Sequence, residues 1–295
     1  MTTSKPLSTT LSKPFTIEPL DATFGAVITG LSLTDLTDAA FAGLYDTWLE
    51  YALLVFPGQH LSNDEQVAFA KRFGALEFDL APLSNVREDG SVRTDDADDM
   101  VKVLKGNMGW HTDSTYMPVQ AKGAVFTAHV VPAAGGETAW ADLRAGYREL
   151  DPDTKQRIAG LSAYHSLYHS QKNFGMPKKK DSEYSGYGFF NQDPPLRPLV
   201  KIHPETDQPV MTIGRHAYGI PGLGEDESQK LLADLVTFTA QAPRVYQHAW
   251  SPGDAVVWDN RCLLHRGCPW DMNEPRVMYH SRIAGSQNSE FAAPA

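Results

Sequence analysis

The spacing of apolar residues along the chain predicts many short strands. Apolar and polar positions alternate over residues 15–20 and 25–30, whereas residues 52–56 are wholly apolar, as in a buried strand. This last run is stopped by Pro57 and Gly58, a pair that is typical of turns. Further strand-like runs follow at 124–131, 137–142, 198–202, 210–213, 246–250, 255–258 and 277–283.

Helical spacing of apolar residues predicts four helices among these strands. Ser62 and Glu65 have the pattern of a capping box at the start of the second helix, which ends at Gly74. Pro152 lies inside the third and indicates a break or a second start. The four segments are 34–50, 62–73, 143–161 and 226–240. The whole pattern predicts a mostly β fold with flanking helices, an antiparallel double-stranded β-helix (a jelly roll, cupin-like).

Two stretches lack a clear pattern and are candidate active-site loops. The regular spacing is lost from residue 76 to residue 105, a stretch that includes the acidic run 95–99. Within it, residues 81–105 form either a flexible lid or a plain solvated loop. Residues 165–197 are polar, aromatic and glycine-bearing, and we expect them to form one wall of a pocket.

Length and composition are typical of a soluble globular protein. The 295 residues are 42% apolar and 21% charged, and we expect a disordered tail at 1–14 and a single domain over 15–295. No apolar stretch approaches the ~20 residues of a membrane span and no export signal is seen, so we predict a cytoplasmic protein without a membrane partner.

The charge of the chain bears on its partners. A formal charge of −10 argues against a nucleic-acid partner, because phosphate binding needs a basic surface. The basic run Lys178-Lys179-Lys180 is short and flanked by acidic residues, so we interpret it as a solvated loop.

The two cysteines, Cys262 and Cys268, are predicted to be free thiols in a reducing cytosol. The alternatives are a disulfide between them, or a zinc site that uses both thiolates with His265. No paired-cysteine or Cys/His cluster of zinc-finger spacing is present to favour the zinc site.

Candidate chemistry centres on Gly109-Trp110-His111-Thr112-Asp113-Ser114-Thr115. If this stretch is extended, His111 and Asp113 lie on one face of a strand. The pair lacks one ligand for a metal site, and His265 is the best candidate because it follows the strand-like run 255–258 and its polar end. Two histidines and one carboxylate form the facial triad of non-haem Fe(II) oxygenases and leave the opposite positions open. The alternative is a hydrogen-bonded structural histidine.

Arg276 and Thr138 predict an anion site beside the metal. Arg276 follows His265 by eleven residues, so a loop between adjacent strands would return it to the metal. A guanidinium pairs with a carboxylate through two hydrogen bonds and keeps its charge. Thr138, which follows Gly135-Gly136-Glu137, offers a hydroxyl that can donate to the same carboxylate. The spacing fits a dicarboxylate.

These motifs resemble those of the Fe(II)- and 2-oxoglutarate-dependent dioxygenases of the taurine and 2,4-dichlorophenoxyacetate dioxygenase group. The resemblance covers nearly the whole chain and rests on residues 110–113, 135–138 and 258–276. It implies that the cofactors are Fe(II), 2-oxoglutarate as cosubstrate, and O2.

The same resemblance implies a role for each candidate residue. The iron ligands would be His111, Asp113 and His265, which with Arg276 are the implied catalytic residues. Thr138 and Arg276 would hold the distal carboxylate of 2-oxoglutarate, and Asn107 matches an active-site asparagine of the taurine branch.

Within the group, residues 56–64, 111–119 and 213–217 look most like the (S)-phenoxypropionate dioxygenases. The implied reaction is hydroxylation of a small carboxylate, with ether cleavage of an aryloxyalkanoate and release of succinate and CO2. His280 departs from this pattern, because it stands four residues after Arg276, where taurine and (R)-phenoxypropionate dioxygenases carry an arginine for the substrate's acid group. An amino acid, a sulfonate or a specialised metabolite is therefore the alternative substrate.

Three further cations could bind the acid group in place of that arginine. They are Arg215, Arg282 and Lys71, although each is predicted to be a surface or structural charge. A catalytically silent jelly-roll module that retains a metal is the non-enzymatic alternative. As partners we expect a small-molecule acid substrate and further copies of the chain in a homo-oligomer.

Overall fold

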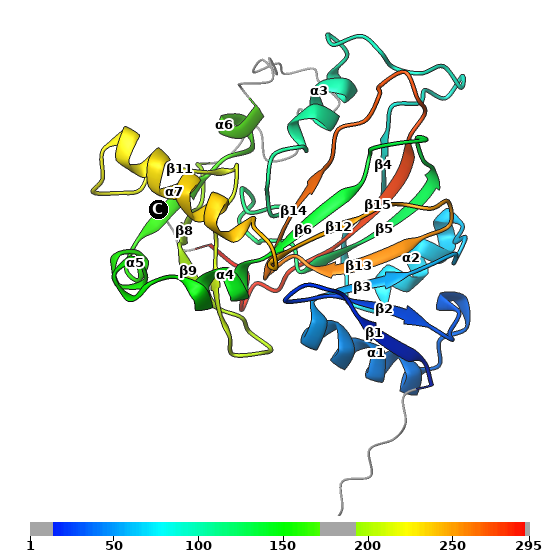
Figure 1. The fold of residues 1–295 in the computed structure, drawn as a ribbon, viewed down its shortest axis with the longest axis horizontal. Coiled ribbons are helices and arrows are strands. Elements are labelled where there is room, and N and C mark those ends of the chain that lie inside the picture. The colour runs from blue at the N-terminus through cyan, green and yellow to red at the C-terminus, as the bar shows by residue number, and fades with distance from the viewer. Residues whose placement is uncertain (1–13, 172–192, 293–295) are drawn as a thin grey trace, which may run out of the picture.

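A large antiparallel sheet forms the framework of the chain in the computed structural model, which describes residues 14–171 and 193–292 (Figure 1). Its strands are antiparallel except for the parallel pair β2–β3. In spatial order they are β1 (Thr16–Pro19), β2 (Ala26–Thr29), β3 (Leu53–Phe56), β13 (Ala255–Asp259), β5 (Gly123–Val130), β15 (Val277–Ile283) and β4 (Leu76–Ser84).

A second sheet packs against one face of the first. It contains β12 (Val245–His248), β6 (Thr138–Asp142) and β14 (Leu263–Gly267), with β6 in the centre. Buried side chains of both sheets, such as Trp140, Trp258 and Leu264, belong to one apolar cluster. Two sheets with a shared core form the jelly roll that the sequence predicts.

Helices and small sheets complete the fold. The helices are η1 (Leu33–Asp35), α1 (Asp38–Tyr51), α2 (Asn63–Lys71), α3 (Asp99–Gly106), α4 (Leu143–Glu149), α5 (Pro152–Ile158), α6 (Leu167–Gln171) and α7 (Glu225–Thr239). The small sheets are β11 (Ala217–Tyr218) with β7 (Ser162–His165) and β8 (Leu196–Pro198), and β10 (Pro209–Met211) with β9 (Val200–Ile202).

The central strands are wholly apolar because both of their faces are covered. On β3, Leu53 faces the cluster between the two sheets, whereas Leu54 faces a second cluster with Trp48 of α1 and Phe69 of α2. Burial of a large apolar side chain contributes about 1.5–3 kcal/mol, so this two-sided packing is a main source of stability. Among the described residues, no helix is long and apolar enough to cross a membrane.

Several local predictions are confirmed. Ser62 and Glu65 form a capping box, in which the Glu65 carboxylate accepts from the Ser62 N–H at 2.8 Å. Pro152 is the first residue of α5 and separates it from α4, which accounts for the predicted break.

The prediction that residues 76–105 are irregular is wrong. This stretch contains edge strand β4, whose side chains are mostly half-buried and so lack a strong alternation. It also contains α3, whose buried face includes Val101 and Leu104. In the acidic run, Asp98 caps α3 and forms ion pairs with Arg87 and Arg93. The predicted tail, the basic run 178–180 and most of 165–197 lie outside the described residues.

Candidate active site

The structure brings His111, Asp113 and His265 together, although not on a strand as predicted. His111 pairs with His265 of β14 in an isolated bridge, with N–H···O distances of 3.0 and 2.8 Å. The chain then turns at once, because Ser114 has a φ of 55° and Met117 N–H donates to the Ser114 carbonyl. The extended prediction is therefore wrong beyond His111, and the turn carries the Asp113 carboxylate back toward both imidazoles.

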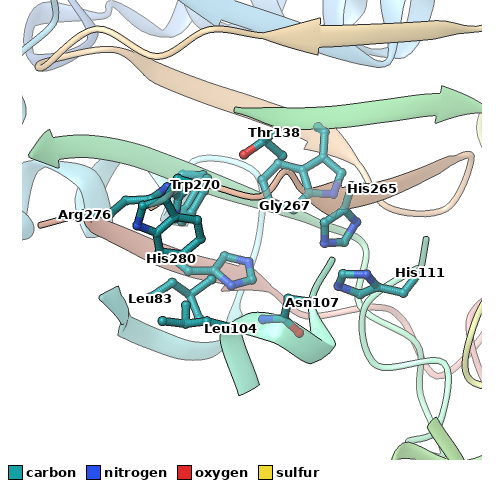
Figure 2. A pocket seen from close by; sticks show the side chains of 12 residues that line it. Leu83, Leu104, Asn107, His111, Thr138, His265, Gly267, Trp270, Arg276 and His280 are labelled. Atoms are coloured by element: carbon teal, nitrogen blue, oxygen red, sulfur yellow. The ribbon is translucent and has the colours of Figure 1, made fainter. Parts of the chain in front are cut away.

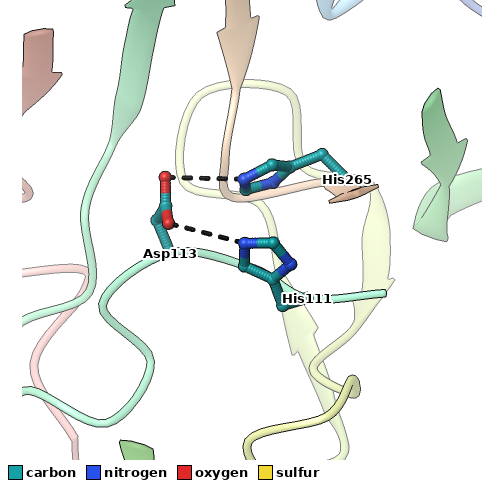
Figure 3. Close-up of side chains that lie close together, drawn as sticks. All are labelled: His111, Asp113 and His265. Atoms are coloured by element: carbon teal, nitrogen blue, oxygen red, sulfur yellow. Dashed lines mark ion pairs between the residues drawn. The ribbon is translucent and has the colours of Figure 1, made fainter. Parts of the chain in front are cut away.

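The three side chains surround a small polar space (Figure 3). His111 Nε2 is 4.0 Å from Asp113 Oδ1, and His265 Nε2 is 3.7 Å from Asp113 Oδ2. These distances are too long for hydrogen bonds, and the three ligand atoms all lie within 4.8 Å of one another. Asp113 Oδ2 is buried and has no hydrogen-bond partner among the described residues. An ion about 2.0–2.2 Å from each ligand atom would satisfy this oxygen, so the residues fit a metal.

The protonation states also suit a metal. Burial lowers the pKa of His265 to about 4 and that of His111 well below its usual range, so both rings are neutral near pH 7. Burial alone would raise the pKa of Asp113, but the Arg282 guanidinium and nearby histidines outweigh it, and the pKa is lowered. Neutral imidazoles and a carboxylate are the forms that bind metals.

Backbone contacts hold these ligands in place. His111 Nδ1 lies 2.8 Å from the Gly109 carbonyl oxygen, which makes Nδ1 the protonated nitrogen and leaves Nε2 unprotonated, with a free lone pair for a metal. The Asn260 side chain accepts from the Asp113 N–H at 2.8 Å and donates to the Asp113 carbonyl at 3.0 Å. Sequence reasoning missed this role of Asn260, although its place in the polar end of the strand-like run 255–258 is a signal that it faces the site.

The two candidate histidine ligands, His111 and His265, lie at one side of a pocket between the two sheets (Figure 2). Side chains from both sheets, from α3 and from the loops line it. They are Leu83, Leu104, Asn107, His111, Phe126, Thr138, Trp258, His265, Trp270, Arg276 and His280, together with Gly267. The apolar members were not predicted as site residues, because in sequence they are ordinary core positions of strands and helices.

Arg276 and Thr138 line the same pocket, as the sequence predicts. Arg276 immediately precedes β15, and its Nε donates to the Gly136 carbonyl at 3.0 Å, while Trp270 covers the guanidinium at 5.1 Å from ring centroid. Burial lowers the pKa of Arg276 to about 10, so it remains charged near pH 7. Thr138 Oγ1 accepts from Trp250 Nε1 at 3.0 Å, and its own proton is therefore available to another acceptor.

Asn107 is the C-cap of α3 and is oriented by Arg215. The Arg215 guanidinium donates to Asn107 Oδ1 at 3.0 Å and also to the Gly106 carbonyl. Because Oδ1 faces Arg215, the amide nitrogen of Asn107 points into the pocket as a donor (Figure 2).

The structure places the candidate residues for binding the substrate's acid group in different surroundings. Arg215 and Arg282 are structural charges as predicted. Arg215 is half-buried and bound to Asn107, whereas Arg282 is buried and donates to Asp113 Oδ1 at 3.0 Å. Lys71 is exposed and pairs with Asp79 at 3.1 Å. His280 lines the pocket, where Trp258 stacks on its ring, and its Nε2 has no hydrogen-bond partner among the described residues.

The cysteine predictions are also resolved. Cys262 and Cys268 are both buried free thiols, so no disulfide forms. Cys262 lies near His203 and Asp259 in a second group of metal-ligand types. The Asp259 carboxylate is already bound by His203 and by Arg261, at 3.0 and 2.7 Å, so this group is a structural ion-pair cluster.

Comparison with known proteins agrees with this geometry. The family model described as "Taurine catabolism dioxygenase TauD, TfdA family" matches residues 16–282. The chain is 61% identical to an (S)-phenoxypropionate/alpha-ketoglutarate-dioxygenase from Sphingobium herbicidovorans, over 96% of this chain and 99% of that protein. It is 55% identical to a protein of the same name from Delftia acidovorans, over 94% and 97%. A crystal structure of AAD-2 with Mn(II) and N-oxalylglycine is similar with a TM-score of 0.86 at 33% identity, covering 95% of this chain and 99% of that one.

Proposed function

The chain belongs to the taurine catabolism dioxygenase TauD/TfdA family, and we propose that it hydroxylates a small aryloxyalkanoate and thereby cleaves its ether bond. As an enzyme of this family it is a dioxygenase that depends on Fe(II), 2-oxoglutarate and O2. The observation that carries the proposal is one pocket lined by His111 and His265, with Arg276 at a distance from these two histidines (Figure 2). Asp113 lies beside both histidines and completes the group of three candidate ligands (Figure 3). Residues 15–295 then act as a single dioxygenase domain.

In this proposal, His111, Asp113 and His265 hold Fe(II). When bound, the iron supplies O2 chemistry in which 2-oxoglutarate is decarboxylated to succinate and CO2, one oxygen atom enters succinate, and the other converts a substrate C–H into C–OH. A hydroxyl on the carbon that bears an aryl ether oxygen gives a hemiketal or hemiacetal. Its collapse releases a phenol and a keto acid or aldehyde acid.

The protein binds and orients the reactants. Arg276 pairs with the distal carboxylate of 2-oxoglutarate, and the Thr138 hydroxyl donates to the same group because Trp250 occupies its acceptor side. The Asn107 amide donates to a bound carboxylate from the opposite wall. Phe126 and Trp258 exclude water around the reacting carbon.

The choice of an aryloxyalkanoate as substrate follows from the similarity to (S)-phenoxypropionate dioxygenases, and a turnover assay tests it. We expect succinate and phenol to form in equal amounts from (S)-2-phenoxypropionate and 2-oxoglutarate, with pyruvate as the other product. Asp113→Ala is the control and should abolish both products. Succinate formation from other small acids but not from phenoxypropionates would overturn the substrate assignment and leave the reaction class intact.

His280 supports a second candidate substrate class. The pocket carries an imidazole where an arginine would bind a substrate acid group, and burial lowers the pKa of His280 to about 3, so it offers no positive charge near pH 7. An amino acid, a sulfonate or a specialised metabolite is thus the alternative. A panel of such acids, scored by succinate formation, separates the two. The cytoplasmic location and the homo-oligomer stay predictions from the sequence.

A further inference from the structure

A buried chain of polar side chains lies directly behind Asp113. Arg282 of β15 donates from Nη2 to Asp113 Oδ1 at 3.0 Å and from Nη1 to Ser114 Oγ at 3.2 Å. The Ser114 hydroxyl donates in turn to the Glu77 carboxylate of β4 at 2.9 Å. One guanidinium therefore holds two consecutive residues, the candidate metal ligand and the residue after it.

This contact makes the two carboxylate oxygens of Asp113 unequal. Oδ1 is occupied by Arg282, whereas the buried Oδ2 has no hydrogen-bond partner among the described residues. Oδ2 lies 3.7 Å from His265 Nε2 and 3.6 Å from His280 Nε2, on the side of the pocket. A carboxylate whose second oxygen is held by a guanidinium offers one oxygen to a metal instead of two.

The backbone supports the same arrangement. Ser114 has a φ of 55°, in the left-handed region that non-glycine residues rarely adopt. This conformation turns the chain so that the Asp113 carboxylate and the Ser114 hydroxyl both reach Arg282.

The charges explain why Glu77 is present. Arg282 is buried, and a lone guanidinium beside Asp113 would cancel the negative charge that attracts a cation. Glu77 is joined to Arg282 through the Ser114 hydroxyl, and its carboxylate gives the group of Asp113, Arg282 and Glu77 a net negative charge.

We propose that Arg282 is a positioning residue for the metal site, which fixes Asp113 as a ligand through Oδ2 alone, and that Glu77 balances its charge through Ser114. The proposal rests on the proposed function. A ligand that binds through one oxygen keeps the remaining metal positions open for 2-oxoglutarate and O2.

The test is Co(II) binding to the metal-free protein, measured by calorimetry and by the visible absorption of bound Co(II). Arg282→Lys keeps the positive charge and removes the two-pronged contact. Loss of such an outer partner typically weakens metal binding about 10- to 100-fold. In Arg282→Lys we therefore expect the Kd for Co(II) to rise by this factor and the Co(II) absorption spectrum to change.

A matched control separates positioning from general loss of stability. Arg144 is also buried and pairs with Asp142, with Nε 3.0 Å from Oδ1, but neither residue lines the pocket. Arg144→Lys should lower the melting temperature and leave Co(II) affinity unchanged. A folded Arg282→Lys variant with wild-type Co(II) affinity and spectrum would overturn the proposal.

Glu77→Gln provides a second measurement, which also serves if Arg282→Lys does not fold. The amide oxygen still accepts from Ser114, but one negative charge is lost, so we expect several-fold weaker Co(II) binding. Unchanged affinity in this variant would overturn the role of Glu77. If the wild-type protein itself bound no Co(II), the proposed function would fail. If the wild type and both variants bound Co(II) equally well, only the proposed roles of Arg282 and Glu77 would be removed.

Discussion

At the scale of single residues, neighbours outside the pocket decide what each polar atom can do inside it. Trp250 occupies the acceptor side of Thr138, and Arg215 occupies the oxygen of Asn107, so both residues are left as donors facing the pocket. With the Arg276 guanidinium, the pocket thus offers donors from several walls. Donors of this kind suit a ligand with carboxylates, as the proposed function requires.

Thr138→Val tests the donor role of this hydroxyl. Valine keeps the shape and removes the donor, and hydrogen bonds to charged groups contribute about 1.5–3 kcal/mol, so we expect the KM for 2-oxoglutarate to rise about 10- to 100-fold. Steady-state succinate formation at varied 2-oxoglutarate measures this. Thr212→Val is the matched control, because Thr212 Oγ1 is buried, has no hydrogen-bond partner among the described residues and lies outside the pocket. Equal KM values for both variants would contradict the role of Thr138.

At the scale of elements, the loop between β5 and β6 positions Arg276. Gly135 and Gly136 have φ values of 78° and 72°, and a Cβ on Gly136 would lie 3.2 Å from Arg276 Cδ and Nε. The Gly136 carbonyl accepts from Arg276 Nε at 3.0 Å. Gly136 is needed because its backbone passes directly against the Arg276 side chain, and Gly135 because a Cβ there would lie 2.5 Å from the Pro269 carbonyl oxygen.

Gly136→Ala should therefore displace Arg276. We expect a higher KM for 2-oxoglutarate together with a loss of more than about 1 kcal/mol in the free energy of unfolding, since alanine is strained at this φ. Gly222→Ala is the control, because Gly222 has a φ of 89° and a Cβ added there would meet nothing within 4 Å, so only the backbone strain is added. Urea unfolding and 2-oxoglutarate kinetics of the two variants are compared, and a wild-type KM in Gly136→Ala would refute the positioning of Arg276 by this loop.

The elements also show how far the sequence could predict the fold. The strands β3, β5 and β13 were predictable because both faces are covered and their residues are wholly or mostly apolar. Edge strand β4 was missed because it is only half-buried. The stretch after His111 was predicted as a strand, yet it turns at Ser114, whose positive φ nothing in the local pattern indicates.

The candidate site was predicted only in part, because residues in recognisable motifs could be identified from the sequence and supporting residues could not. His111, Asp113, His265, Thr138 and Arg276 belong to motifs. In the structure four of them line the pocket, and Asp113 lies beside His111 and His265. Arg282 was predicted to be a surface or structural charge, with binding of the substrate's acid group as the alternative, and its contact with Asp113 was not predicted. On a strand, residues two apart share a face, so Arg282 shares that of Met278 and His280, and this spacing was the signal available.

At the scale of the whole molecule, the described chain buries many histidines in neutral form. Burial lowers the pKa of His165 and His280 to about 3 and that of His265 to about 4, and it lowers the pKa of His111 and His216 as well. A histidine whose folded pKa lies below its unfolded value binds fewer protons when folded. The metal-free protein should therefore lose stability as the pH falls below about 6.5, the unfolded value.

His165→Leu tests this dependence away from the metal site. His165 lies on β7, is 1% exposed, and neither ring nitrogen has a hydrogen-bond partner among the described residues. Between its unfolded pKa of about 6.5 and its folded pKa of about 3, each pH unit removes about 1.4 kcal/mol of stability. On going from pH 7.5 to pH 4.5, the free energy of unfolding should thus fall by about 2–3 kcal/mol less in the variant than in the wild type. Urea unfolding of both metal-free proteins at the two pH values measures the difference. An equal fall in the free energy of unfolding of the wild type and the variant would show that His165 takes up its proton in the folded state. The acid sensitivity would then have to come from other groups.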